Sequence, residues 1–325
     1  MRNKIKWRLG LMAVIFPAVC LASQAETYPS KPVQLVAPMA PGGGIDTLAR
    51  YVSQKLSERL GKTVVVENRP GANGNIGAGL VSRAPADGYT LLATYVGTQA
   101  INPSLYKNLG FDPIEDFEAV APLAAASYAA VINASVPANT FQELVEYARA
   151  NPGTLNYGSA GMGSVGHLAG KLFEQETGTE LTYISYKGTA PALIDLRAGR
   201  IQVMFNTLSS MKSNLDDGTV RALALLSPTP SGKHPDVPTT PKIGYKNLEV
   251  STWFGIVAPK GTPKDIVEQL NREINLVLED EEVKKWFADH EYETMHMSAS
   301  EFSTFITQER DRWNKIIVDG KVTIE

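Results

Sequence analysis

The sequence predicts an α/β protein of two lobes, each built on a doubly wound, mostly parallel sheet, with two hinge crossings between the lobes. Apolar strand candidates alternate with helical stretches along the chain, which is typical of parallel sheets that are covered on both faces. The same alternation begins again halfway along the chain. The chain has 325 residues, of which 43% are hydrophobic. This length exceeds one ordinary core, so two domains are expected.

Residues 1–25 are predicted to be a secretory signal peptide. A basic start precedes an apolar run over residues 9–21, and small residues lead up to Ala25. The run is too short for a transmembrane helix, which needs about 20 apolar residues. Cys20, the only cysteine, follows Val19 rather than the small residue of a lipoprotein site. We therefore expect cleavage near Ala25 and a periplasmic protein without disulfides.

Charge and composition argue against several classes of protein. The net charge is −3, and the predicted signal peptide holds only basic charges, so the remainder is more acidic still. This balance argues against a nucleic-acid partner, which would require basic patches. The four histidines lack metal-ligand spacing, so neither a metal nor a cofactor is expected. No later stretch is apolar enough to span a membrane. We expect a soluble monomer.

The first lobe begins with three buried strands, each followed by a loop or helix. The predicted strands are residues 33–38, 63–67 and 89–94, and the predicted helices are residues 46–60 and a shorter one that leads from the glycine-rich residues 71–79 to about Arg83. The longer helix carries apolar residues at helical spacing and stops at Gly61.

The second lobe repeats this pattern. The predicted strands are residues 129–133, 155–158, 181–186, 203–205 and 220–226, and the predicted helices are residues 140–150, 164–178 and 189–198. Thr140 is the expected N-cap of the first of these helices. Proline and glycine dominate residues 228–244, which we interpret as an excursion at the lobe boundary.

The C-terminal part has one strand, residues 253–258, and then three helices without a sheet of their own. These helices are residues 264–278, 281–290 and 300–317. They are expected to pack on the N-terminal sheet, so the chain must cross between the lobes near residues 122–128 and 250–259. The predicted lobes are residues 26–123 with 252–325, and residues 124–251.

The first candidate binding loop contains Pro41, Gly42, Gly43, Gly44 and Asp46. Glycines at a helix start let backbone N–H groups face a ligand without obstruction by Cβ atoms, and such groups attract anions. A phosphate-binding P-loop would need a lysine and a serine or threonine after the last glycine, and this loop lacks them. The alternative is a tight turn in which Asp46 only caps the helix.

The second candidate loop contains Ser159, Gly161, Gly163, Ser164, Val165 and His167. Its glycines match the dinucleotide fingerprint, but the next strand ends without the acidic residue that binds a ribose. Ser164 is a poor nucleophile candidate, because Met162 stands where a nucleophile elbow needs glycine. An anion site at the helix start is the remaining interpretation. His167 is either part of that site or a satisfied histidine within the helix.

Other strand ends supply further candidates, because ligands of open parallel sheets bind at the carboxyl ends of the strands. These candidates are Thr94, Thr98, Asn102, Lys187, Thr189 and Asn206. Lys187 is predicted either to pair with a second carboxylate or to be solvated. Thr189 is predicted either to contact the ligand or to cap a helix. The neutral amide of Asn206 can both donate and accept hydrogen bonds.

Nine collinear segments carry a resemblance to a known family. They are residues 28–33, 41–46, 65–72, 86–91, 102–106, 158–161, 186–192, 203–205 and 253–263. Together they resemble the solute receptors of tripartite tricarboxylate transporters, the Bug family, over almost the whole mature chain. The resemblance implies a type II-like, two-lobed periplasmic binding-protein fold and a non-enzymatic receptor for citrate-like acids, dicarboxylates, aromatic acids or amino acids.

The resemblance also implies roles for particular loops and partners. One carboxylate of the ligand would be held by backbone N–H groups and water from residues 41–46 and 159–167, and the receptor would deliver it to membrane permease subunits. The family usually has aspartate where Asn206 stands, so the far end of the ligand is expected to differ. The alternatives are a ligand-sensing partner of a sensor kinase and a periplasmic enzyme acting on a carboxylic acid, for which no base–nucleophile pair is identified.

Overall fold

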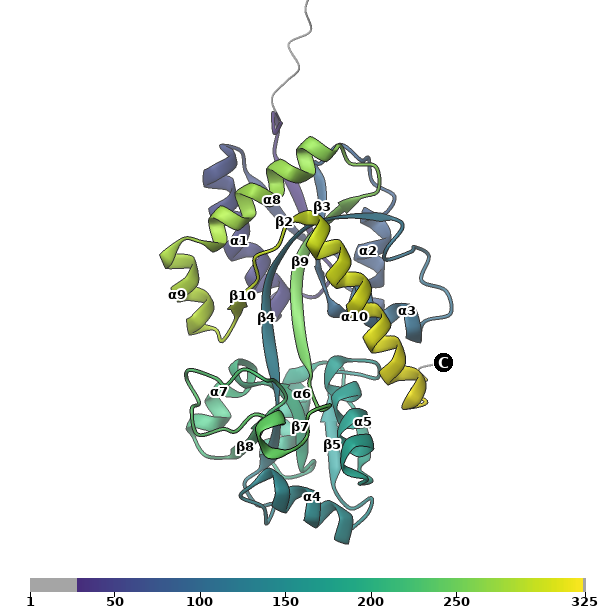
Figure 1. The fold of residues 1–325 in the computed structure, drawn as a ribbon, viewed down its shortest axis with the longest axis vertical. Coiled ribbons are helices and arrows are strands. Elements are labelled where there is room, and N and C mark those ends of the chain that lie inside the picture. Colours follow the sequence, from purple (N-terminus) through teal and green to yellow (C-terminus); the bar gives the residue numbers. More distant parts are fainter. Residues whose placement is uncertain (1–27, 324–325) are drawn as a thin grey trace, which may run out of the picture.

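Two lobes lie one above the other in the computed structural model, which describes residues 28–323 (Figure 1). The predicted signal peptide lies outside the described residues. Strands β4 (Phe117–Asn133) and β9 (Ser251–Pro259) run between the lobes and pair with each other in antiparallel orientation. They correspond to the two predicted crossings. The predicted two-lobed α/β fold class is confirmed.

The sheet of lobe 1 combines parallel and antiparallel strands. β1 (Val33–Ala37), β2 (Val64–Asn68) and β3 (Thr90–Tyr95) are parallel, in the order β2-β1-β3. β9 lies antiparallel between β3 and β4, and the short β10 (Glu293–Thr294) adds to the other side of β4.

The sheet of lobe 2 has the same mixed character. β5 (Asn156–Ser159), β6 (Thr182–Ser185) and β7 (Val203–Thr207) are parallel, whereas β4 is antiparallel to both β7 and β8 (Val220–Leu225). β4 changes its partners between Ser127 and Tyr128.

The sheets are more mixed than the sequence predicted, for a topological reason. β4 enters lobe 2, and β9 enters lobe 1, running away from the boundary between the lobes. The parallel strands of each lobe run toward that boundary, so each entering strand pairs with them in antiparallel orientation. The carboxyl ends of the parallel strands of both lobes therefore face each other.

Helices cover both faces of each sheet. In lobe 1, α1 (Gly44–Leu60), α8 (Lys264–Leu278) and α9 (Glu281–Asp289) cover one face, and α2 (Asn75–Val81), α3 (Asn102–Leu105) and α10 (Ala299–Asp319) cover the other. In lobe 2, α4 (Phe141–Ala150) and α5 (Val165–Thr177) lie opposite α6 (Thr189–Arg197) and α7 (Leu208–Asp216). The prediction that the three C-terminal helices pack on the N-terminal sheet is confirmed.

Several predicted helix ends are confirmed by their hydrogen bonds. The hydroxyl of Thr140 accepts a hydrogen bond from the Glu143 N–H (3.2 Å), which caps α4 as predicted. Gly178 ends α5 in a left-handed conformation, which glycine adopts at little cost. The sequence missed the π-helical turn Gly97–Ile101 and α3 after it. It also placed the start of α1 two residues late, at Asp46 rather than Gly44.

Candidate functional site

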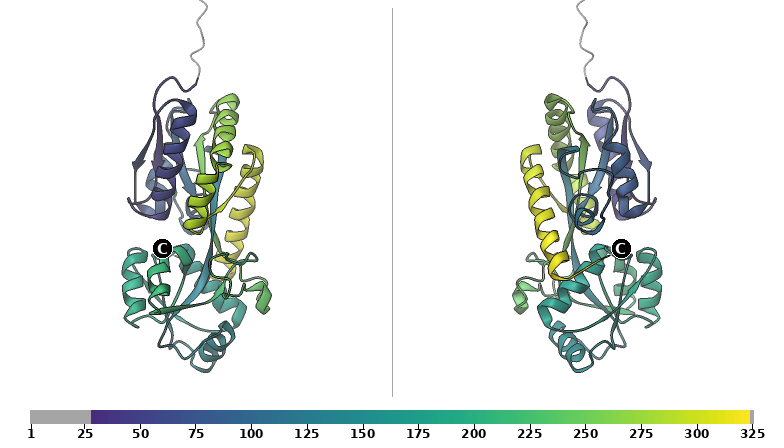
Figure 2. Two further views of the ribbon diagram at one scale, coloured as in Figure 1. Left: turned by 90° about the vertical axis from the view of Figure 1, so that its left-hand side faces the viewer. Right: turned by 90° about the vertical axis from the view of Figure 1, so that its right-hand side faces the viewer.

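The two glycine-rich loops lie at the facing ends of the two lobes. The glycine loop of lobe 1 (residues 41–46) connects β1 to α1, and the glycine loop of lobe 2 (residues 159–167) connects β5 to α5. Because β1 and β5 both run toward the lobe boundary, their following loops and helix starts are directed toward the opposite lobe (Figure 2). The two loops therefore belong to different lobes and approach one boundary.

The glycine loop of lobe 1 presents free backbone donors. Pro41 and the three glycines after it are exposed, and Gly42 has φ +82°, which favours glycine. No side chain caps α1, and the N–H groups of Gly43, Gly44 and Ile45 donate to no other described residue. These N–H groups stand at the start of a helix of 17 residues, and free N–H groups at a helix start attract anions.

Asp46 is not the N-cap of α1 and is not free to bind a ligand. It is 3% exposed, and its Oδ2 accepts hydrogen bonds from the Gly42 N–H (2.9 Å) and Arg50 Nε (3.1 Å). Its Oδ1 accepts from Asn68 Nδ2 (2.7 Å). Burial raises the pKa of Asp46, but these hydrogen bonds outweigh burial and hold the pKa below its ordinary value. The aspartate is therefore ionised, and its hydrogen bond to Gly42 stabilises the loop from the buried side.

The glycine loop of lobe 2 contains a network of hydroxyl groups. Ser164 Oγ donates to Ser159 Oγ (2.9 Å), and Ser159 Oγ lies 2.8 Å from the Tyr183 hydroxyl. Ser164 is also the N-cap of α5, because its Oγ accepts from the His167 N–H (3.4 Å). Val165, the first residue of α5, is buried. The serine hydroxyls line the loop beside the helix start.

His167 has its hydrogen-bond partner within this loop, which agrees with the interpretation of a satisfied histidine within the helix. Its Nδ1 accepts the Gly163 N–H (3.1 Å), and its ring lies 4.1 Å from that of Tyr183. The side chain is 4% exposed. Burial, assisted by the charge of Lys171, lowers the pKa of His167 to about 4. The imidazole is therefore neutral at pH 7 and is not exposed to a ligand.

The ends of β6 and β7 lie beside the glycine loop of lobe 2. The Gly188 N–H donates to the Ala160 carbonyl (3.1 Å), which joins the two loops. Lys187 is exposed and forms no ion pair with another described residue. Thr189 is the first residue of α6 rather than its cap. Asn206 is half-buried, and its Oδ1 accepts the Thr207 N–H (2.9 Å), which leaves the amide nitrogen available.

Three of the predicted contacts lie inside lobe 1. Thr94, Thr98 and Asn102 have no exposed surface. The two threonine hydroxyls lie 2.7 Å apart, and Asn102 Nδ2 donates to the Asn75 side chain (2.5 Å) and the Asn73 carbonyl (2.9 Å). In this arrangement these side chains offer no surface to a ligand and instead stabilise the segment after β3.

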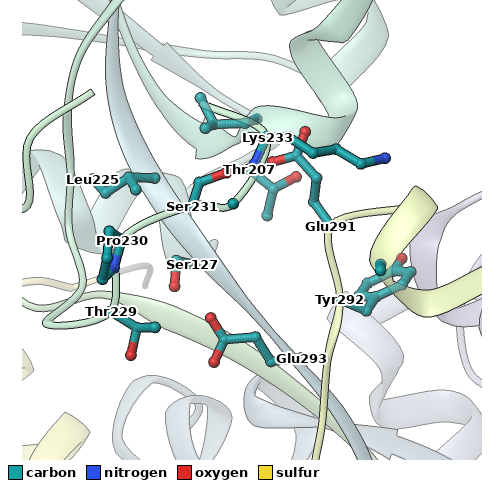
Figure 3. A pocket seen from close by; sticks show the side chains of 13 residues that line it. Ser127, Thr207, Leu225, Thr229, Pro230, Ser231, Lys233, Glu291, Tyr292 and Glu293 are labelled. Carbon is teal, nitrogen blue, oxygen red and sulfur yellow. Dashed lines mark hydrogen bonds between the residues drawn. The ribbon is translucent and has the colours of Figure 1, made fainter. Parts of the chain in front are cut away.

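A cavity of about 460 Å³ lies between the lobes, and no predicted site residue lines it (Figure 3). Lobe 2 contributes Thr207 and the segment 229–233, lobe 1 contributes the segment 291–293, and Ser127 on β4 lies between them. The cavity adjoins the glycine loop of lobe 1, since the Tyr292 hydroxyl lies 3.2 Å from the position a Cβ on Gly44 would occupy. Sequence patterns carry no sign of this cavity, because its residues come from loops far apart in the chain.

Two features were not found among residues 28–323. No helix there has the length and apolar character needed to cross a membrane. No group of three or more histidine, cysteine, aspartate or glutamate side chains in that part of the chain is arranged to hold a metal ion.

Known proteins are similar to this chain in sequence and fold. The model of the family described as "Tripartite tricarboxylate transporter family receptor" matches residues 48–321. Protein BugT of Bordetella pertussis is 34% identical over 90% of this chain and 90% of its own. The structure of Rpa4515 of R. palustris with adipate is 34% identical, with a TM-score of 0.84 over 91% of this chain and all of that one.

A second solved structure, MatC of Rhodopseudomonas palustris with bound malate, is 28% identical. Its TM-score is 0.79, over 89% of this chain and all of that one. The family is one of solute receptors and not of enzymes, as the resemblance implied. This chain belongs to the tripartite tricarboxylate transporter receptor family.

Proposed function

We propose that this protein is a periplasmic receptor that binds a small carboxylate-bearing solute between its lobes and delivers it to the permease subunits of a tripartite tricarboxylate transporter. The observation that carries the proposal is the pair of glycine-rich helix starts on opposite lobes. In the glycine loop of lobe 1, the free N–H groups at the start of α1 have no partner among the described residues. Such groups stabilise an anion.

The expected affinity agrees with the number of donors. A helix N-terminus stabilises an anion by about 0.3–2 kcal/mol. Charge-assisted hydrogen bonds add about 1.5–3 kcal/mol each. Two helix starts and several such bonds support micromolar binding, which corresponds to about 8 kcal/mol. Only closed lobes bring both loops onto one carboxylate, so the ligand binds the closed form more tightly and shifts the population toward closure.

The relatives support the ligand class. Rpa4515 was solved with adipate and MatC with malate, and both ligands are dicarboxylates. In this chain Lys187 is exposed without an ion-pair partner among the described residues, and we expect it to meet a second negative charge on the ligand. The neutral amide of Asn206, near the end of β7, adds no negative charge to the cleft, which favours an acid or a neutral polar group at the far end over an ammonium group.

A thermal-shift panel of carboxylic acids tests the proposal. The purified chain would be mixed with dicarboxylates, tricarboxylates, aromatic monocarboxylates, amino acids and the matching amides or alcohols. We expect at least one acid to raise the melting temperature in a saturable manner, by RT ln(1 + [L]/Kd) in free energy. The corresponding amide should have no effect. If no carboxylate stabilises the chain, or if amides do so equally well, the proposed ligand class is wrong.

A further inference from the structure

The two glycine loops share one hydrogen-bond arrangement, although their sequences differ. Gly42 and Gly163 have φ of +82° and +77°. The N–H of each glycine donates to a side chain four residues later, in the first turn of the following helix. In lobe 1 the acceptor is Asp46 Oδ2 (2.9 Å), and in lobe 2 it is His167 Nδ1 (3.1 Å). A carboxylate and a neutral imidazole thus occupy equivalent places.

Neither acceptor faces the space between the lobes. Asp46 is 3% exposed and His167 is 4% exposed. Every polar contact recorded for Asp46 is with its own lobe, through Gly42, Arg50 and Asn68. These two side chains therefore act on the loops and not on a ligand directly.

Each arrangement also separates the backbone donors into two groups. The N–H of Gly42 or Gly163 is directed inward to its acceptor. In lobe 2 the Ser164 N–H also has an acceptor, the Gly161 carbonyl (3.1 Å), whereas other donors at the start of each helix are left without a partner. In lobe 1 these are the N–H groups of Gly43, Gly44 and Ile45, and in lobe 2 those of Val165 and Gly166, none of which donates to another described residue. A glycine is free to rotate, so without the inward bond the loop would lose the orientation that aligns these donors.

The charge of Asp46 is compensated where it lies. A lone carboxylate beneath an anion site would repel the ligand, but Arg50 Nε lies 3.0 Å from Asp46 Oδ1 and Arg50 also binds the Asn68 side chain (2.7 Å). The pair is neutral overall, so Asp46 can orient the loop at little electrostatic cost to a bound carboxylate.

We infer that Asp46 and His167 are the positioning residues of the carboxylate site, one in each lobe, and that neither contacts the ligand. The inference rests on the proposed function for the identity of the ligand. The hydrogen-bond arrangement of the two loops does not depend on which ligand binds. The inference assigns one role to two residues for which the sequence pattern left two interpretations open, a ligand contact or a structural role.

Isosteric substitutions separate the hydrogen bond from the shape of the side chain. Asp46→Asn and His167→Asn each keep an acceptor oxygen near the original acceptor, whereas Asp46→Leu and His167→Leu have the same shape as the asparagine variants and no acceptor. Thr140→Ala serves as the control, because it removes a helix-capping acceptor at α4, at the far end of lobe 2 (Figure 1).

Two readouts are needed. Amide spectra of ¹⁵N-glycine-labelled protein report the hydrogen bonds of Gly42 and Gly163 without any ligand, and titrations with adipate and with malate report binding. We expect each leucine variant to shift the amide resonance of its own glycine and to weaken binding about tenfold, the loss of roughly one charge-assisted hydrogen bond. The asparagine variants should recover most of the affinity, and Thr140→Ala should bind as the parent does.

The outcomes distinguish the inference from the proposed function. If the parent binds neither acid, the ligand assignment fails, and the glycine amide spectra alone decide whether Asp46 and His167 position the loops. The inference is overturned if the leucine variants leave the amide resonances of Gly42 and Gly163 unchanged. It is also overturned if the asparagine variants bind as weakly as the leucine variants, since loss of binding would then not follow the acceptor.

Discussion

The hydroxyl oxygen of Tyr292 lies 3.2 Å from the position that a Cβ on Gly44 would occupy. Gly44 is the first residue of α1, near the N-terminus of the chain, and Tyr292 lies between α9 and β10, near its C-terminus. The C-terminal segment therefore forms one wall of the glycine loop of lobe 1. It also links that loop to the cavity between the lobes, which Tyr292 lines (Figure 3).

This contact predicts an energetic coupling between Gly44 and Tyr292. A methyl group in Gly44→Ala would stand too close to the Tyr292 hydroxyl, whereas Tyr292→Phe removes the oxygen concerned. Residues in direct contact show coupling of about 0.5–3 kcal/mol. We expect Gly44→Ala to be tolerated better in the Tyr292→Phe background by at least about 0.5 kcal/mol, measured by urea unfolding. Additive effects of the two changes would contradict the contact.

Gly43→Asp is predicted to abolish binding of carboxylates through charge. Gly43 has φ −78°, and a Cβ there meets only the Ala40 carbonyl, at 3.5 Å, so an L residue fits. A carboxylate at this position would repel the ligand from the free N–H groups. Gly43→Asn has the same shape without the charge and serves as the control. We expect the aspartate variant to bind at least about tenfold more weakly than the asparagine variant, by calorimetric titration; equal affinities would place the ligand elsewhere.

Asn206→Asp is predicted to change ligand preference with little effect on stability. The Oδ1 that accepts the Thr207 N–H is retained, but the substitution introduces a negative charge at the end of β7. Acids with an ammonium or hydroxyl group at the far end should gain relative to dicarboxylates, by at least about fivefold in affinity ratio. Asn139→Asp makes the same charge change on an exposed residue before α4 and should leave the profile unaltered. If Asn206→Asp also leaves the ligand preference unaltered, Asn206 does not line the ligand pocket.

The lowered pKa of His167 predicts that the free energy of unfolding falls in mild acid. Because burial lowers the pKa of His167 to about 4, below the ordinary value of about 6.5, the unfolded chain binds a proton between these values and the folded chain does not. The contribution of neutral His167 is complete above about pH 6.5 and falls as the pH drops toward 4, by up to about 3 kcal/mol. Urea unfolding across this range should show a weaker pH dependence for His167→Asn than for the parent. Parallel curves would refute the prediction.

The buried carboxylate of Glu309 is predicted to make a large contribution to stability. This carboxylate of α10 is 9% exposed and accepts hydrogen bonds from the indole N–H groups of Trp253 (3.1 Å) and Trp313 (3.3 Å). Both tryptophans are buried. Glu309→Leu leaves two buried donors without a partner and is expected to lower the free energy of unfolding by about 2–4 kcal/mol. Glu309→Gln keeps one acceptor oxygen and should lose less. Equal losses in thermal or urea unfolding would contradict this explanation.

The sequence predicted the elements well where local patterns decide them. The amphipathic α8 and the Thr140 cap of α4 follow from residue spacing and from side chains next to them in the chain. The start of α1 was missed because aspartate is a common N-cap residue, whereas the Asp46 carboxylate accepts a hydrogen bond from the Gly42 N–H, which precedes the helix. The turn after β3 was missed because Thr94, Thr98 and Asn102 resemble ligand contacts, and only their burial shows that they bind each other and their neighbours.

The sequence by itself determined that the chain has two α/β lobes with glycine-rich helix starts in each, since hydrophobic periodicity and glycine placement are local properties. Only the tertiary structure decided which groups of those loops are free. Asn68 reaches Asp46 from another strand, Tyr183 packs on His167, and Tyr292 reaches Gly44 from nearly the opposite end of the chain. Each of these contacts joins residues that become neighbours only when the sheets form, and no pattern along the chain records which side chain a buried acceptor will meet.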